Sequence, residues 1–299
     1  EASLVEFQSV YDLLNIQFDS FNGEAFYNDK MQNVVDELKE KNLLTESEGA
    51  QVVQLPNLPP CLITKQDGAT LYATRDLAAA FYREQQYKPA KVLYVVGNEQ
   101  SLHFKQLFSV IEMMGYDWAR QLQHVPFGMM LKDGKKMSTR KGRVILLKDV
   151  LQEAIEMAAK TIQEKNPQLE NSEEVAKQVG VGAVLFHDLK NFRLHDVEFS
   201  VEQMLSFEGE TGPYLQYTYA RIQTLLSKAS VGSSNIDSLE ILDDAAWSGI
   251  LLLQDYPTIV EKAYEEADPS LIAKYALQLA RSFNKYYGNT KILVHDDQL

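Results

Sequence analysis

The chain has 299 residues, 45% hydrophobic and 24% charged, which suggests about two globular domains and excludes global disorder. The net charge of −13 argues against binding of nucleic acid or anionic lipid through overall charge, so any such contact needs a local basic patch. A single cysteine excludes an internal disulfide and a cysteine-based metal cluster.

No apolar run approaches the roughly 20 residues that cross a bilayer. The first residues lack a signal-peptide core, so we expect a cytoplasmic protein without membrane contact. The five histidines have no zinc-ligand spacing, and we expect no protein-bound metal.

Residues 1–60 are expected to mix helix and turns. Residues 30–42 carry apolar side chains at helical spacing, and the prolines at 56, 59 and 60 are expected to end this region. Asp67-Gly68 lies between two short apolar runs and predicts a hairpin within 62–72. An alanine-rich helix is expected over 75–86.

Residues 91–97 are a near-continuous apolar run of the kind buried in parallel sheets. A helix over 101–114 and a strand over 123–131 follow. Residues 61–131 therefore alternate strand, helix, strand, helix, strand, which indicates part of an open α/β sheet.

After residue 143 the pattern becomes helical. The stretch 190–200 is polar and loop- or strand-like, and 230–238 is expected to be a linker. The predicted helices cover 148–165, 172–190, 213–229, 238–266 and 269–287.

Gly97, Glu99, Gln100 and His103 follow the apolar strand. Ligands of open α/β sheets bind at this edge. Glycine lets a ligand approach the backbone, a carboxylate accepts from ribose hydroxyls, and the helix N-terminus favours anions. A plain strand-to-helix turn capped by Ser101 explains the same residues.

Residues 132–148 contain seven basic residues and one acidic residue, a net +6 in an acidic chain. Glycines at 134 and 142 allow the segment to move. Cations on such a loop can pair with a polyphosphate whose charge grows in a transition state. The alternative is a solvated basic loop.

Tyr72 and Asp76 are four residues apart where a strand turns into a helix. An aromatic hydroxyl and a carboxylate at this spacing could hold a cationic ligand. Asp76 could equally be an acid of the first helical turn, favoured by the helix dipole.

Tyr214, Tyr217 and Arg221 share one face of the helix that Pro213 begins. Tyrosine and arginine side chains on one face can stack on nucleic-acid bases or bind a backbone. The alternative is a packing face between domains.

Taken in order, these segments resemble the class I aminoacyl-tRNA synthetases, and the arginyl-tRNA synthetases in particular. Lys136-Met-Ser-Thr-Arg is similar to the Lys-Met-Ser-Lys-Ser signature, and Gly97, Glu99 and His103 are similar to GxDxxxH with Glu for Asp. Residues 71–79 resemble the arginine-recognition segment, and 209–221 the start of the helical anticodon-binding domain.

The resemblance implies a partial Rossmann-like parallel sheet, the second half of a class I catalytic domain, followed by a helical anticodon-binding bundle. The implied division is 1–131 for the partial catalytic domain, 132–204 for the signature loop and connecting helices, and 205–299 for the bundle. The first class I signature, His-Ile-Gly-His, is absent. We therefore expect a fragment truncated at both ends and inactive alone.

The implied reaction joins ATP and L-arginine into arginyl-adenylate and then transfers the arginyl group to tRNA. Mg²⁺ would accompany ATP, and we expect a monomer. The alternative is a non-catalytic tRNA-binding or interaction module derived from a synthetase.

The resemblance also implies a role for individual residues. Arginine would meet Tyr72, Asp76 and Gln100, and adenosine would meet Gly97, Glu99 and His103. The catalytic phosphate loop would comprise Lys136, Met137 and Ser138, with Lys135, Arg140 or Lys141 in place of the signature lysine that Thr139 replaces. The tRNA would meet Arg143, Tyr214, Tyr217 and Arg221.

Overall fold

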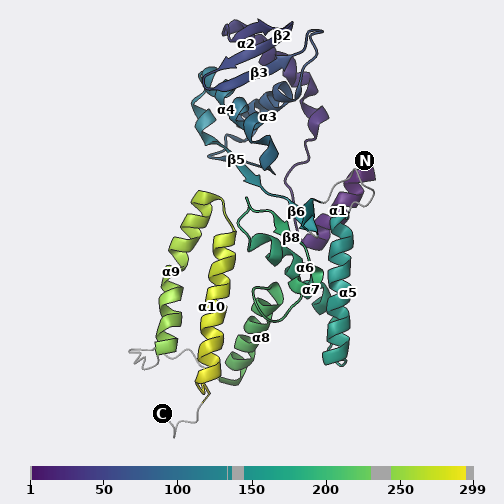
Figure 1. Ribbon diagram of the computed structural model, residues 1–299, viewed down its shortest axis with the longest axis vertical. Coiled ribbons are helices and arrows are strands. Elements are labelled where there is room, and N and C mark those ends of the chain that lie inside the picture. The colour runs from purple at the N-terminus through teal and green to yellow at the C-terminus, as the bar shows by residue number, and fades with distance from the viewer. Residues whose placement is uncertain (1, 133, 137–144, 230–243, 294–299) are drawn as a thin grey trace. The chain divides into compact units, whose positions relative to one another are not determined.

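The computed structural model describes residues 2–132, 134–136, 145–229 and 244–293. Their contacts form two compact units: Gln17–Gly128, called here the α/β unit, and Glu1–Ile16 with Met129–Leu299, called the helical unit (Figure 1). Within the described ranges no helix is long and apolar enough to cross a membrane. The expected three-part division of the chain stays a prediction.

The first half of the α/β unit contains a small antiparallel sheet that the sequence did not predict. Helical segments η1 (Glu24–Lys30) and α2 (Met31–Glu40) precede strands β1 (Leu44–Ser47), β2 (Ala50–Leu55) and β3 (Leu58–Thr64), which pair in the order β1-β2-β3. The expectation of helix and turns over 1–60 was wrong here. Pro59 and Pro60 lie exposed in β3, an edge strand, where a missing N–H is tolerated.

Strand β3 carries the only cysteine of the chain. Cys61 is 2% exposed and packs in the core with Ile63 and Val53. Burial raises the pKa of the Cys61 thiol to about 11. The thiol is therefore protonated at neutral pH and behaves as a small apolar group.

The turn after β3 forms, but its second arm is not a strand. The Lys65 amide donates to the Ala69 carbonyl, and a single bridge joins Thr64 to Thr70. Helix α3 (Tyr72–Tyr87) then begins, and Thr74 Oγ1 donates to the Ile63 carbonyl at 2.5 Å. The predicted turn of the hairpin is present, but its predicted second strand is wrong. The buried bond of Thr74 fixes the start of α3 beside β3 instead.

The second sheet of the unit is parallel, as the sequence predicted. Strand β4 (Val92–Gly97) pairs with β5 (Leu122–Phe127), connected by η2 (Asn98–Gln100), α4 (Ser101–Met113) and η3 (Asp117–Gln121). β3 was expected in the same series but belongs to the antiparallel sheet beside β2.

Only one face of β4 is covered in the described chain. Leu93 is 46% and Val95 is 64% exposed, whereas Val92, Tyr94 and Val96 pack against the core under α3 and α4. The expectation of a fully buried strand was wrong, since the apolar run alternates between a packed and an exposed face.

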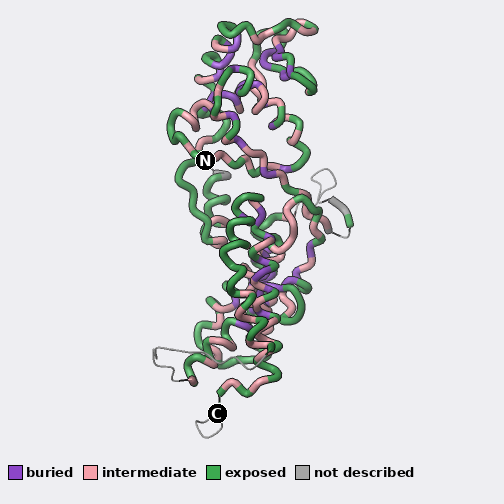
Figure 2. The backbone as a smooth tube through the Cα atoms, turned by 90° about the vertical axis from the view of Figure 1, so that its left-hand side faces the viewer, coloured by how far each residue is buried: buried purple, intermediate pink, exposed green. Residues whose placement is uncertain are grey.

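The helical unit confirms the predicted change of character. A small sheet of order β7-β6-β8 accompanies the helices. A buried cluster includes Leu151, Ala183 and Met204, and Figure 2 colours the buried stretches of the chain purple. Its elements are α1 (Ala2–Leu14), β6 (Met130–Lys132), β7 (Lys135–Lys136), α5 (Leu147–Lys165), α6 (Ser172–Leu189), β8 (Val197–Glu198), α7 (Val201–Met204), α8 (Gly212–Ala229), α9 (Asp244–Glu266) and α10 (Ser270–Asn289).

Helices α5 and α6 approach closely at Gly180. A Cβ built on Gly180 would lie 2.7 Å from the backbone of Ile155, so only glycine fits without a shift of the helices. The predicted linker 230–238 lies outside the described residues.

Candidate functional site

The carboxyl end of β4 and the turn after it, residues 97–101, are called here the ledge. Gly97 ends the strand, η2 follows, and α4 begins at Ser101. The Glu99 carboxylate folds back over Gly97, so that a Cβ built there would overlap it. A side chain at position 97 would therefore displace the carboxylate from the ledge.

Two site residues predicted for different ligands contact each other. His103 Nε2 lies 2.6 Å from Asp76 Oδ2, joining the first turn of α4 to the second turn of α3. The His103 side chain is 23% exposed and the Asp76 side chain 43%. The pair is thus half-buried and open to solvent on the aspartate side.

Tyr72 and Gln100 each lie about one helical turn before a member of this pair. Tyr72 is 72% exposed and shares a helix face with Asp76, four residues on. Gln100 precedes His103 by three residues. That Tyr72, Asp76 and Gln100 hold one ligand stays a prediction.

Arg75 is anchored beside Tyr72. Its guanidinium lies 5.8 Å from the centre of the Tyr72 ring and 2.6 Å from the Glu24 carboxylate. The Glu24 ion pair therefore restrains the cation next to the predicted arginine contacts.

An aromatic stack behind the pair was not predicted. The His103 ring meets Phe104 edge-on at 5.3 Å, and Phe104 stacks on His124 with ring centres 4.6 Å apart. His124 Nε2 lies 3.0 Å from the Val96 carbonyl of β4. Helical spacing marks Phe104 as a core residue, but no spacing rule links it to a histidine on another strand.

Tyr94 and Arg83 lie beneath the same site. Burial raises the pKa of Tyr94, Arg83 opposes that shift, and the negative charge of Asp76 adds to it. The Arg83 guanidinium lies 5.4 Å from the centre of the Tyr94 ring. The charge of Asp76 thus reaches into the packed side of β4.

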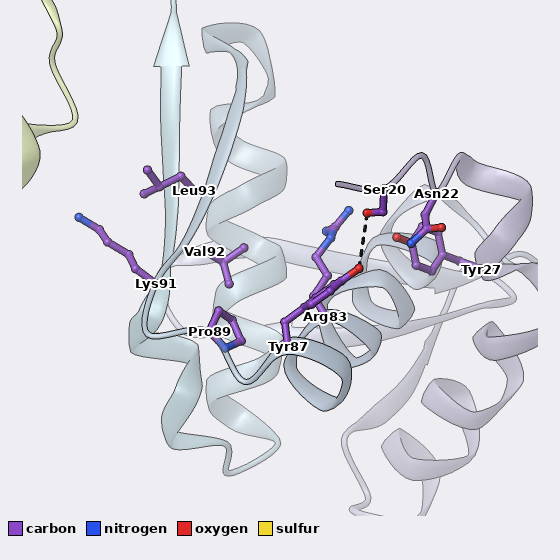
Figure 3. A pocket seen from close by; sticks show the side chains of 9 residues that line it. All are labelled: Ser20, Asn22, Tyr27, Arg83, Tyr87, Pro89, Lys91, Val92 and Leu93. Atoms are coloured by element: carbon purple, nitrogen blue, oxygen red, sulfur yellow. Dashed lines mark hydrogen bonds between the residues drawn. The ribbon is translucent and has the colours of Figure 1, made fainter. Parts of the chain in front are cut away.

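A polar hollow of about 370 Å³ lies at the opposite end of α3 (Figure 3). The hydroxyl of Tyr87, the last residue of α3, donates to Ser20 Oγ at 3.4 Å across it. Arg83 and Tyr27 also line it, but no sequence-predicted site residue does.

The segment 132–148, called here the basic loop, begins in the antiparallel pair β6–β7. Two carboxylates in and just before β8 accept hydrogen bonds from backbone amides around this pair. The Gly134 amide donates to Glu198 Oε2 at 3.1 Å, and the Met129 amide to Asp196 Oδ1 at 2.7 Å. Lys135 and Lys136 form β7. The predicted residues Met137, Ser138, Arg140, Lys141 and Arg143 lie outside the described residues.

The tyrosine face of α8 is tied to α10 through one amide. Asn284 Nδ2 donates to the Tyr214 hydroxyl at 3.0 Å and to Thr218 Oγ1 at 2.8 Å. Arg221 donates to Asn284 Oδ1 at 2.6 Å and to the Tyr217 hydroxyl at 2.9 Å. The amide thus uses both ends, and Tyr214 is held between the two helices.

Arg221 is also enclosed by two rings. Its guanidinium lies 4.7 Å from the centre of the Tyr217 ring and 4.8 Å from that of Tyr287. These contacts favour the packing alternative for Tyr214 and Arg221, while Tyr217 stays 51% exposed. Contact of this face with RNA stays a prediction.

Within the described ranges no group of three or more His, Cys, Asp or Glu side chains could hold a metal ion.

Two family models match the chain. One described as "tRNA synthetases class I (R), catalytic domain" matches residues 1–201, and one described as "DALR anticodon binding domain" matches 215–299. These matches confirm the fold class expected from the sequence, a partial Rossmann-like catalytic domain followed by a helical bundle.

Relatives of known name match over nearly the whole chain. It is 57% identical over 298 residues to an arginine–tRNA ligase of an Exiguobacterium species and to arginine–tRNA ligase 2 of Bacillus anthracis. Each alignment covers 99% of this chain and 53% of the relative. The chain thus spans about half the length of the curated relatives it matches.

Solved structures agree with these relatives. The arginyl-tRNA synthetase of Plasmodium falciparum superposes with a TM-score of 0.88 at 27% identity, covering 99% of this chain and 52% of that one. The Thermus thermophilus arginyl-tRNA synthetase gives 0.85 at 25% identity, covering 95% and 55%.

Proposed function

The chain belongs to the arginyl-tRNA synthetases of class I, and on this basis we propose that its protein joins L-arginine to tRNA with ATP. The observation that carries the proposal is the Asp76 carboxylate, held at 2.6 Å by His103 beside the ledge at the carboxyl end of β4. A carboxylate oxygen accepts short, charge-assisted hydrogen bonds from a guanidinium. Tyr72 and Gln100 are proposed to complete this arginine site.

The ledge is proposed to receive ATP. Gly97 leaves room for the adenosine, and the Glu99 carboxylate would turn from the glycine to accept from ribose hydroxyls. His103, which the resemblance places at the adenosine, contacts the Asp76 carboxylate.

The reaction needs no side-chain nucleophile. In the first step a carboxylate oxygen of arginine bonds to the α-phosphorus of ATP, and pyrophosphate leaves. In the second, a hydroxyl of the terminal tRNA ribose attacks the arginyl carbonyl carbon and AMP leaves. The protein contributes positioning and charge stabilisation.

The basic loop is proposed to stabilise the phosphates. This role is assigned to Lys135, Lys136, Met137, Ser138, Arg140 and Lys141. Magnesium is proposed only as the companion of the ATP phosphates, with no side chain assigned to it.

Contact with tRNA is proposed to be local because the chain carries −13. Arg143 on the basic loop would meet phosphates, and the exposed Tyr217 ring would offer a stacking surface; Tyr214 and Arg221 would support that ring from α8. We further propose a cytoplasmic monomer, whose size is measurable by light scattering.

The test is Asp76→Ala in the intact protein that carries this chain, measured by arginine-dependent ATP–pyrophosphate exchange. Removing one partner of a buried charge pair should weaken arginine binding by about 2–5 kcal/mol, at the lower end because Asp76 is 43% exposed. The KM for ATP should stay unchanged. Asp117→Ala, an exposed aspartate of η3, is the matched control.

Absence of any arginine-dependent exchange in the intact wild-type protein, with tRNA binding retained, would favour the rival function of a non-catalytic RNA-binding module. The tyrosine face of α8 is the observation that would support that module.

A further inference from the structure

We propose that His103 is a positioning residue for arginine recognition: it holds Asp76 by one carboxylate oxygen and leaves the other for the substrate guanidinium. The inference rests on the proposed function and assigns His103 to the arginine site instead of the adenosine site. It starts from the 2.6 Å contact between His103 Nε2 and Asp76 Oδ2.

The imidazole is fixed from behind. Phe104 meets it edge-on at 5.3 Å and is itself stacked on His124. His124 is tied to the Val96 carbonyl of β4. Because the stack reaches the parallel sheet, the His103 ring is a stationary donor, whereas a solvent-facing aspartate alone would exchange among rotamers.

The donor is already in use on the side that faces Asp76. A neutral imidazole has one N–H and one acceptor nitrogen. With the proton on Nε2, the bond to Asp76 consumes the only donor, and Nδ1 remains as an acceptor. A ribose or phosphate oxygen of ATP that needs a donor would therefore have to break the contact with Asp76.

One oxygen of Asp76 remains available to a cation. The contact with His103 uses Oδ2, and Oδ1 has no hydrogen bond to another described residue. Tyr72 lies one turn away on the same helix face and Gln100 three residues before His103. The groups proposed to hold arginine thus lie within about one helical turn of the pair, and His103 restrains the Asp76 carboxylate through Oδ2.

Three substitutions in the intact protein separate this role from others. His103→Gln can place an amide donor near the position of Nε2, His103→Asn is too short to do so, and His103→Leu has no donor. KM for arginine, KM for ATP and kcat are measured for each by ATP–pyrophosphate exchange. Thermal unfolding of each variant controls for loss of fold.

His103→Leu and His103→Asn should raise the KM for arginine about 10- to 100-fold, since hydrogen bonds to charged groups lie in that range. KM for ATP and kcat should change little, and His103→Gln should restore the KM for arginine toward wild type. In Asp76→Ala, adding His103→Leu should have little further effect, because the two residues act as one unit.

Other outcomes overturn the proposal. A raised KM for ATP with unchanged arginine KM would return His103 to the adenosine site. Equal behaviour of the Gln and Asn variants, or additive effects with Asp76→Ala, would make His103 a structural residue. If Asp76→Ala itself left arginine KM unchanged, the proposed arginine site would fail, and that result is distinct from failure of His103 alone.

Discussion

Asn284 offers the sharpest test of how the helical unit is held together. Asn284→Ala removes two neutral hydrogen bonds, to Tyr214 and Thr218, and one from the Arg221 guanidinium. Neutral bonds contribute about 0.5–1.5 kcal/mol each and charged ones about 1.5–3. Water replaces part of the loss at Arg221, which is half-buried, so we expect a loss of about 2–4 kcal/mol.

The two tryptophans make this loss measurable for one unit alone. Trp118 lies in η3 of the α/β unit and Trp247 in α9 of the helical unit. In a Trp118→Phe background, fluorescence during urea unfolding reports only on Trp247. With a slope of about 2 kcal/mol per molar urea, the midpoint should fall by about 1–2 M.

Asn284→Asp is the matched control. The carboxylate still accepts from Arg221, and the Tyr214 hydroxyl can rotate to donate to it. Thr218 Oγ1 already donates to the Tyr214 carbonyl at 2.9 Å, so only one weak bond is lost. We expect a change below about 1 kcal/mol. A midpoint shift as large for Asp as for Ala, or none for Ala, would refute the reasoning.

Three further predictions concern other parts of the helical unit. Gly180→Ala should lower the free energy of unfolding by about 1–3 kcal/mol because the added methyl group overpacks α5 against α6. Urea unfolding would instead show a gain in stability, from the higher helix propensity of alanine, if the two helices can separate freely. Burial lowers the pKa of His187 in the folded state. Its contribution to the free energy of unfolding is therefore present above the unfolded pKa of about 6.5 and is lost as pH falls through the lower folded pKa. His187→Gln should reduce this loss of stability between pH 8 and 5, and an unchanged pH dependence of the unfolding free energy would contradict the prediction. The triple variant Arg140→Ala, Lys141→Ala and Arg143→Ala of the intact protein removes three predicted phosphate-binding cations. The slope of log affinity for tRNA against log salt concentration should become shallower by roughly 0.7–0.9 for each phosphate that is no longer neutralised. Tyr217→Ala should lower the affinity at nearly constant slope, and an unchanged slope in the triple variant would make the loop a solvated one.

Local patterns predicted the elements that local forces decide. The parallel pair β4–β5 followed from an apolar run and an intervening helical stripe, and most helix boundaries in the second half agree within one or two residues. Strands β1 and β2 were not predicted, because their turns use Glu48 and Asn57 at positive φ and the sequence around them lacks a strict alternation of apolar and polar residues. Antiparallel pairing there is decided by the packing of β2 and β3 against α3 and α4, a tertiary effect.

The sequence predicted which residues belong to the candidate site but not which of them contact each other. Asp76 and His103 each lie near the start of a helix that follows a strand, which placed both at an edge where ligands bind. Their mutual hydrogen bond spans 27 residues and depends on the angle between α3 and α4, which no spacing encodes. Asn284 was missed for the same reason, since an asparagine inside a helix gives no sign of the partners it meets on another.

The buried thiol of Cys61 has a practical consequence for spectroscopy. Because it is 2% exposed and its pKa is raised to about 11, maleimide reagents should leave the folded wild-type chain unlabelled. Cysteines introduced at exposed positions outside the proposed substrate contacts, such as Asp117 in η3 and Glu265 in α9, would then be the only reactive thiols of this chain. A donor and an acceptor dye at such positions would measure the distance between the two units with and without substrates, without first removing a native cysteine from the core.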